Sequence, residues 1–250
     1  MIEGQLDKND ARIDAAIRQV EGAILTLIGK LKDKGGLIVS DKINLQRAVD
    51  LRAQVASEFT IFDDAVAEAV NTFSTVGPNV KAAFGGDVAF TDVDASIISQ
   101  FASDTLDTIT GIKAQTVQDI NAAIYSAALA GTEKQEIIDT VRQLLVGGID
   151  KAGRPLANAA KTIVQTKYMQ IDAVMMKTKG NEAGIEKYRY TGSLIKDSRQ
   201  WCVDHVGEEL TPDQISEWDS QTWQGKSPGP SFVARGGWNC RHRWIPVRNK

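Results

Sequence analysis

The side chains best suited to metal chemistry are four residues near the end of this 250-residue sequence. Cys202 and His205 form one close pair, and Cys240 and His242 form another. The chain contains no other cysteine or histidine. Thiolate sulfur and imidazole nitrogen are the usual ligands of structural zinc, which two such pairs can enclose in a tetrahedron. The spacing therefore predicts a structural Zn²⁺ bound by all four side chains.

Other roles for these residues stay open on the sequence alone. The two cysteines could form a disulfide in an oxidising compartment, although the polar, acidic N-terminus is unlike a secretion signal and favours reduced thiols. His205 could cap a helix, and Cys202 could be a core thiol beside Trp201. The Cys-x-His spacing of the second pair is also tighter than in most zinc knuckles.

The motifs that mark catalytic metal sites do not accompany these residues. A nucleobase deaminase needs a His-x-Glu motif and a Pro-Cys-x-x-Cys motif, and His205 and Glu208 have a different spacing. The His-Glu-x-x-His signature of metalloproteases and a Walker-type phosphate loop do not occur either. Cys202 and His205 are a weak nucleophile and base pair, because their spacing does not ensure productive contact. The sequence therefore predicts a protein that is not an enzyme.

Charge is distributed unevenly along the chain. The net charge of −3 and the pI near 5.5 argue against a protein whose whole surface binds nucleic acid. From Ser231 onward, however, there are no acidic residues. The basic residues of this tail are candidates for contact with phosphate or with a partner protein. The candidates are Arg235, Arg241, Arg243 and Arg248.

Before residue 180 the sequence is mainly helical in pattern. Apolar residues recur at helical spacing over 11–31 and again over 45–73, where an N-cap at Ser40 or Asp41 precedes the second stripe. Because a short Gly-Gly turn separates the stripes, the pattern predicts an antiparallel hairpin over 11–75. A parallel coiled-coil oligomer would need a longer unbroken heptad run.

Further helices are predicted over 92–179. One spans 92–130, and the next begins at Thr132-Glu133-Lys134-Gln135, which matches a capping box. The last spans Leu156 to Lys179, preceded by a proline and followed by a glycine. These helices complete a helical domain over 1–180.

The remaining residues, 181–250, predict a small α+β module. A strand is expected over 185–191, and a short helix over Pro212–Trp218 with Thr211 as its N-cap. All five tryptophans lie in this module, and a core so small commonly needs a staple such as zinc. The predicted fold is thus mainly α: long antiparallel helices, followed by a small, Trp-rich, zinc-stapled α+β module.

Four segments of the second half carry a family resemblance over about residues 155–247. In order, they are Ala160–Thr166, Tyr188-Arg189-Tyr190, Asp197–His205 with Gly207, and Trp238–His242 with Pro246. This order resembles the C-terminal domain of the phage Mu F-like minor head proteins, also called head morphogenesis proteins.

The chain departs from the family pattern at several positions. Gln165-Thr166-Lys167 stands where the family has Arg-Thr-Glu, and Gly237-Trp238 stands where it often has His-Pro. His205 and His242 stand where it often has cysteine. Exchanging cysteine for histidine preserves a zinc ligand, whereas glycine in place of histidine removes one possible ligand.

The resemblance implies a minor capsid protein of a tailed phage with a docking role and no catalytic turnover. Such a protein assembles on the portal protein or the major capsid protein in the host cytoplasm and then lies inside the virion. Double-stranded DNA, which it could accompany out of the capsid, and further copies of the chain are additional partners. No membrane partner is expected, because no apolar run reaches the length of a membrane span.

Two alternative functions remain on the sequence. The first is a DNA-binding internal or ejection protein that acts through the basic C-terminus. The second is a zinc-dependent enzyme or toxin-related module, since Mu F-like domains resemble modules that are sometimes fused to toxin domains.

Overall fold

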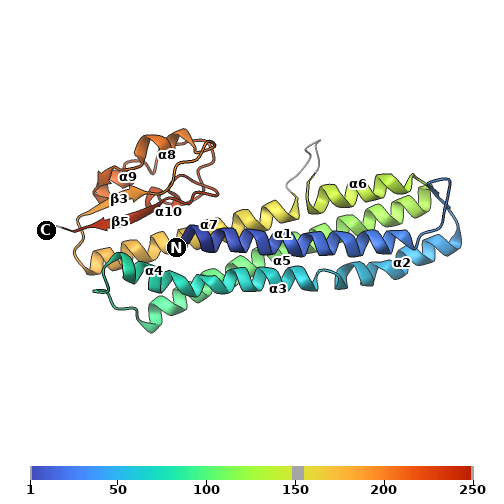
Figure 1. Ribbon diagram of the computed structural model, residues 1–250, viewed down its shortest axis with the longest axis horizontal. Coiled ribbons are helices and arrows are strands. Elements are labelled where there is room, and N and C mark those ends of the chain that lie inside the picture. Colours follow the sequence, from blue (N-terminus) through green and yellow to red (C-terminus); the bar gives the residue numbers. More distant parts are fainter. Residues whose placement is uncertain (1, 148–154, 249–250) are drawn as a thin grey trace. The chain divides into compact units, whose positions relative to one another are not determined.

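The structure is a computed structural model that describes residues 2–147 and 155–248 (Figure 1). It is mainly helical with a small α+β module near the C-terminus, which confirms the predicted fold class. The chain divides into two compact units. Unit 1 contains the residues up to Leu6, Val70–Thr105 and the chain from Thr162 onward, and unit 2 contains Asp7–Ala69 and Leu106–Lys161.

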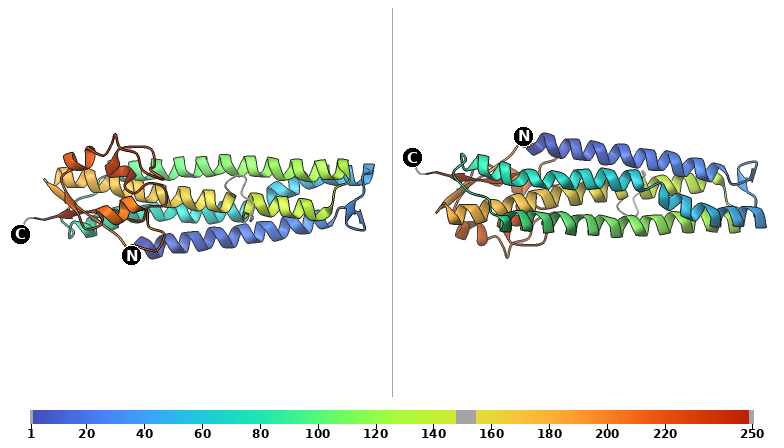
Figure 2. Two further views of the ribbon diagram at one scale, coloured as in Figure 1. Left: turned by 90° about the horizontal axis from the view of Figure 1, so that it is seen from above. Right: turned by 90° about the horizontal axis from the view of Figure 1, so that it is seen from below.

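Unit 2 is built from helices that lie side by side (Figure 2). Residues of α1, α2, α3, α5 and α6 contribute to it, and α7 begins there. The apolar stripe predicted near the start of the chain faces its core, where Ile13, Val20 and Ile24 are fully buried. Burying one such side chain contributes about 1.5–3 kcal/mol. The helices are α1 Ile2–Gly29, α2 Lys42–Ser57, α3 Thr60–Asn71, α5 Asp92–Ala130, α6 Lys134–Leu145 and α7 Leu156–Glu182.

The turn between α1 and α2 is a short β-hairpin of β1 (Asp33–Lys34) and β2 (Leu37–Ile38). Gly35 and Gly36 have φ of 65° and 88°, a conformation that glycine adopts without steric cost. Asp41 then caps α2 by accepting a hydrogen bond from the backbone N–H of Asn44 at 2.7 Å. The second predicted helix is interrupted after Ser57, so α2 and α3 are separate.

The capping box predicted at Thr132 is wrong. Glu133 is the N-cap of α6, and its side chain makes no capping hydrogen bond. The preceding backbone pairs instead with the β-hairpin: Thr132 C=O accepts from Ile38 N–H at 2.9 Å, and Lys134 N–H donates to Gly36 C=O at 2.9 Å. A long-range backbone pairing therefore replaces the local side-chain cap that the sequence suggests.

Unit 1 contains the α+β module, which lies beside α7 (Figure 1). Its antiparallel sheet has the order β4-β3-β5, and Tyr190 of β3 pairs with Trp244 of β5. Thr211 and Gln214 form a capping box at α9, at the N-cap that the sequence predicts. The elements are η1 Thr72–Thr75, α4 Val76–Ala83, β3 Lys187–Thr191, α8 Gln200–His205, β4 Glu209–Leu210, α9 Pro212–Ser216, α10 Ser231–Ala234 and β5 Arg243–Val247.

Most of α7, from Thr162 onward, belongs to the same compact unit as the module. Asp172 of α7 accepts hydrogen bonds of 2.7 and 3.2 Å from the guanidinium of Arg243. Thr166 Oγ1 accepts a bond of 3.1 Å from the backbone N–H of Asn239. The observed division therefore differs from the boundary predicted between residues 180 and 181.

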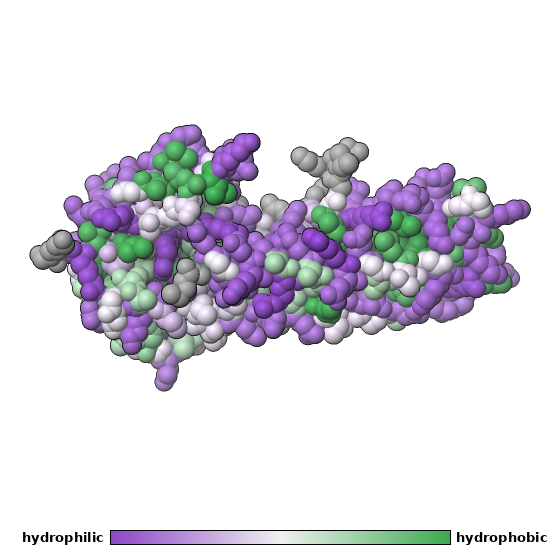
Figure 3. All heavy atoms as spheres, viewed as in Figure 1, coloured by the Kyte–Doolittle hydropathy of each residue, from purple (hydrophilic) through white to green (hydrophobic). Residues whose placement is uncertain are grey.

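The face shown in Figure 3 is largely hydrophilic, and its apolar side chains gather in small separate areas. One of these areas lies over the α+β module. No helix among the described residues combines the length and the apolar composition that crossing a membrane requires.

A buried ion pair joins α5 to α7 within unit 1. Lys179 Nζ lies 2.7 Å from Asp94 Oδ2, and the two residues are only 1% and 4% exposed. Burial opposes ionisation of Asp94, but hydrogen bonds from Lys179 and Thr91 outweigh it and hold its pKa below the usual value. Because the folded-state pKa is lowered, this stabilisation is present above the unfolded-state pKa near 3.9 and is lost as pH falls through the folded-state pKa.

We expect Asp94→Asn to lower the free energy of unfolding by about 1–3 kcal/mol at neutral pH, because it weakens a buried charged hydrogen bond. The deficit should shrink below about pH 4, where the unfolded wild-type chain takes up a proton that the folded carboxylate, with its lowered pKa, does not yet bind. Urea unfolding at neutral pH and below about pH 4 measures this loss of unfolding free energy. Asp87→Asn, which removes the exposed partner of Arg248, is the control and should stay within about 1 kcal/mol of wild type. An Asp94→Asn deficit that is equal at both pH values would contradict the ion-pair account.

Candidate metal centre

Three of the four predicted ligands meet inside unit 1. Cys202 lies on α8, whereas Cys240 and His242 lie in the segment that leads into β5. Asn239, immediately before Cys240, has φ of 59°, a turn conformation that asparagine tolerates better than most residues. This turn directs the chain from α10 back into the sheet, so that Cys240 comes to face α8.

The distances among the three residues fit a tetrahedral metal ion. Cys202 Sγ lies 3.9 Å from Cys240 Sγ, and Cys240 Sγ lies 3.6 Å from His242 Nδ1. With metal–sulfur and metal–nitrogen bonds of about 2.3 and 2.0 Å, a zinc tetrahedron would separate two sulfurs by about 3.8 Å and a sulfur and a nitrogen by about 3.5 Å. All three ligand atoms lie within 4.8 Å of one another. This buried Cys₂His group could hold a metal ion.

His205, the fourth predicted ligand, does not join the group. Its Nδ1 lies 2.7 Å from Glu208 Oε2, and its ring packs against Trp201 and Trp218 at centroid distances of 4.6 and 4.4 Å. His205 is three residues after Cys202, in the last position of a one-turn helix. The His205 ring therefore packs against these two tryptophans and is not part of the Cys₂His group.

Tyr190 and Gly236 form the wall of the Cys₂His group. Tyr190 Oη lies 3.2 Å from Cys240 Sγ and 3.7 Å from Cys202 Sγ, and it accepts a hydrogen bond of 3.2 Å from Gly236 N–H. A Cβ on residue 236 would overlap Cys202 Sγ, so only glycine fits this approach. The rings of Tyr190 and His242 stack at 5.3 Å with an interplanar angle of 21°.

The two thiols differ in acidity because a hydrogen bond from Cys202 stabilises the thiolate of Cys240. The hydrogen bond from Cys202 lowers the pKa of Cys240 well below its ordinary value, with further help from His242 and Arg235. The same bond raises the pKa of Cys202, which acts as the donor. Burial first, and then the charge of Cys240, raises the pKa of Tyr190. A thiolate at Cys240 is the form that binds a metal ion.

The arginines predicted to contact nucleic acid or a partner are engaged inside unit 1. Arg235 is 0% exposed and donates to the backbone carbonyl of Met169, so it is unavailable at the surface. Its Nε and Nη2 are buried without a hydrogen-bond partner. Arg243 binds the buried carboxylate of Asp172, and Arg241 donates to Gln165 at 3.4 Å. Arg248, whose side chain is 47% exposed, pairs with Asp87 at 3.0 Å.

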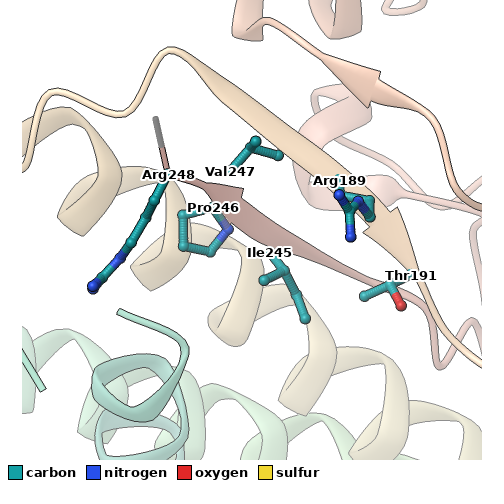
Figure 4. A pocket seen from close by; sticks show the side chains of 6 residues that line it. All are labelled: Arg189, Thr191, Ile245, Pro246, Val247 and Arg248. Atoms are coloured by element: carbon teal, nitrogen blue, oxygen red, sulfur yellow. The ribbon is translucent and has the colours of Figure 1, made fainter. Parts of the chain in front are cut away.

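A surface hollow of about 250 Å³ lies elsewhere, along strands β3 and β5 (Figure 4). It contains two arginines, Arg189 and Arg248, which pair with Glu209 and Asp87. None of its lining residues is a cysteine or a histidine, so it is distinct from the Cys₂His group. The lining residues are Arg189, Thr191, Ile245, Pro246, Val247 and Arg248.

The two thiols of this region are shielded from solvent. Cys202 and Cys240 are only 2% and 3% exposed, which restricts their reaction with external substrates. Gly225–Gly229 has the Gly-x-Ser-x-Gly spacing of a hydrolase nucleophile elbow. Ser227 Oγ, however, is buried without a hydrogen-bond partner, and the segment follows a turn where an elbow would follow a strand. The arrangement is suited to holding the module together.

Sequence reasoning missed Tyr190, Gly236 and Asp172. Tyr190 alternates with Arg189 along β3, and this signal places it on the buried face with a hydroxyl that needs a partner. Asp172 is a lone carboxylate among the apolar residues of α7, which marks a buried ion pair. Gly236 gives no comparable signal, because a glycine required by a close approach is indistinguishable from a glycine in a turn.

Comparisons of the chain with protein-family models, with curated proteins and with solved structures find no match.

Proposed function

We propose that this chain is a non-enzymatic head-assembly protein of a tailed phage, docking on the portal or the inner capsid during procapsid assembly. In this proposal Zn²⁺ is a structural staple of the α+β module. The protein acts in the host cytoplasm during assembly and then lies inside the virion.

The single observation that carries the proposal is the burial of Cys202, Cys240 and His242 in one closely spaced group. The cysteines and His242 lie in two of the four segments on which the Mu F-like resemblance rests. A site buried away from solvent in this way suits a structural metal, whereas a catalytic zinc keeps a position open to substrate. The site therefore supports an architectural role over catalytic turnover.

The module also has apolar side chains available for docking. Ile195 is 70% exposed and Leu194 48%, both in the loop after β3, and Val203 on α8 is 44% exposed. Leu194 and Ile195 are adjacent in the sequence, and adjoining exposed apolar residues are typical of protein interaction sites. We assign the contact with the portal or capsid protein to this part of the module.

The DNA-binding alternative loses support from the engaged arginines. Arg235 is buried, and Arg243 and Arg248 pair with carboxylates. Phosphate would have to displace the carboxylates that pair with Arg243 and Arg248. The basic C-terminal segment therefore offers fewer free cations to DNA.

Co-purification tests the proposal. The tagged full chain is co-expressed with the portal and major capsid proteins of the same phage, and at least one of them should be recovered with it. Ile195→Asp should reduce recovery at least about tenfold, since it places a charge in an apolar contact. Val93→Asp alters an equally exposed residue (68%) outside the module and is the matched control. Recovery of neither partner by the wild-type chain would overturn the proposal.

A further inference from the structure

Three protein ligands leave one corner of a tetrahedral site open, and His205 does not fill it. Structural zinc sites are almost always closed by a fourth protein ligand. The polar side chain next to the Cys₂His group is that of Tyr190, which is fully buried at the centre of β3.

We propose that Tyr190 Oη is the fourth ligand of the metal centre, so that the site is Cys₂His-Tyr. The proposal deepens the structural-staple role and rests on the metal centre of the proposed function. It replaces His205, the ligand expected from the sequence, with a residue from a third segment of the chain.

The position of the phenol oxygen supports this assignment. With metal–oxygen and metal–sulfur bonds of about 2.0 and 2.3 Å, a tetrahedral site places the oxygen about 3.5 Å from each sulfur. Tyr190 Oη lies 3.2 Å from Cys240 Sγ and 3.7 Å from Cys202 Sγ, values on either side of that separation. The phenol oxygen therefore lies beside both sulfurs at separations close to those of a shared ion.

Packing holds the phenol in this position. The Tyr190 ring stacks on His242 and contacts Trp201 and Trp244 at centroid distances of 5.3 and 4.8 Å. Gly236 N–H donates to Tyr190 Oη, and that contact leaves a lone pair of the oxygen for a cation. Such outer contacts are what orient ligands in metal sites.

Charge balance supports the assignment as well. Two thiolates and one phenolate carry one more negative charge than a divalent ion neutralises. Arg235 is a fully buried cation whose charge acts on Cys240, and its Nε and Nη2 lack hydrogen-bond partners. A buried charge requires compensation, and a metal centre with one net negative charge adds to the compensation that Asp172 provides.

Metal uptake at this site involves no change in oxidation state. The ion forms bonds to Cys202 Sγ, Cys240 Sγ, His242 Nδ1 and Tyr190 Oη. The phenol proton and the remaining thiol proton pass to the buffer, as they do when zinc binds protonated ligands elsewhere.

Zinc titration of the metal-free full chain tests the assignment. Wild-type protein should develop the ultraviolet difference spectrum of tyrosinate as one equivalent of Zn²⁺ binds. Tyr190→Phe should lose this signal and bind zinc more than about 100-fold more weakly in competition with a chromophoric chelator, a larger loss than the roughly 10–100-fold that removing an outer-shell partner costs. Tyr188→Phe is the matched control, because Tyr188 is equally buried on the same strand but its hydroxyl has no partner. Tyr188→Phe and His205→Ala should retain both the signal and the affinity.

Two outcomes would overturn the assignment. Wild-type chain that binds zinc without a tyrosinate signal has another fourth ligand, and this measurement needs no variant. His205→Ala that weakens zinc as much as Tyr190→Phe would return the position to His205. Wild-type chain that binds no zinc at all would remove the metal centre itself, whereas the docking function is tested separately by co-purification with the portal and capsid proteins.

Discussion

Cys240→Ser is expected to purify without zinc and to lose the folded structure of the α+β module. Cys240 is central to the Cys₂His group, since its Sγ lies within 4 Å of Cys202 Sγ, Tyr190 Oη and His242 Nδ1. Structural zinc in small domains contributes an apparent binding free energy of about 10–16 kcal/mol, which exceeds the total stability of most domains. Removal of the ion should therefore unfold a module whose own apolar core is small.

Tryptophan fluorescence measures this loss selectively. All five tryptophans lie between Trp201 and Trp244, so their emission reports only on the module. Cys240→Ser, and wild-type protein treated with a chelator, should both show red-shifted emission, with zinc content measured on the same samples. Ser227→Ala alters a nearby buried side chain that makes no hydrogen bond and should retain the metal. Equal zinc in wild type and Cys240→Ser, or none in either, would remove the metal centre from the account of this fold.

Asp172→Asn is expected to lower the free energy of unfolding by about 3–5 kcal/mol, the usual cost of leaving a buried charge without its partner. Asp172 is 1% exposed and binds Arg243 through both carboxylate oxygens. Burial raises the pKa of this carboxyl, and the charges of Arg243 and Arg235 act in the opposite direction. The neutral amide would no longer compensate the charges of the Arg243 and Arg235 guanidinium groups.

Urea unfolding at constant pH measures the effect of Asp172→Asn. Glu209→Gln is the matched control, because it removes the carboxylate of an ion pair with Arg189 that is exposed to solvent. Exposed pairs contribute up to about 1 kcal/mol, so this control should remain close to wild type. If the two variants lose the same stability, Asp172 is not the buried counter-charge that joins α7 to β5.

The helices could be predicted from the sequence because their signals are local. Apolar spacing along 11–31 identifies the buried face of α1, and Asp41 and Thr211 cap the helices that follow them. Thr132 has the same local signature, yet its backbone pairs with β2, more than ninety residues earlier in the chain. A contact so distant in sequence gives no signal in a short window.

The Cys₂His group could be predicted only in part, for a similar reason. Cysteines and histidines are few in this chain, so Cys202, Cys240 and His242 are conspicuous candidates. His205 satisfies the same spacing rule, but Trp201 and Trp218, which pack against its ring, decide where the ring lies. Tyr190 is one of four tyrosines, and nothing local distinguishes it from Tyr188. The basic C-terminal segment was predicted to face outward because the sequence does not reveal that Asp172 and Met169 bind its arginines.

Cys202 and Cys240 lie 38 positions apart in sequence but face each other across 3.9 Å. A metal ion that joins them acts as a reversible cross-link and removes about 4 kcal/mol of entropy from the unfolded chain. Because loop entropy changes slowly with length, doubling the bridged segment would alter this contribution by only about 0.6 kcal/mol. Insertions between the two ligand segments are therefore inexpensive. Proteins that share this centre should vary in the length of that interval while retaining the ligands, Gly236 and the strand that holds Tyr190.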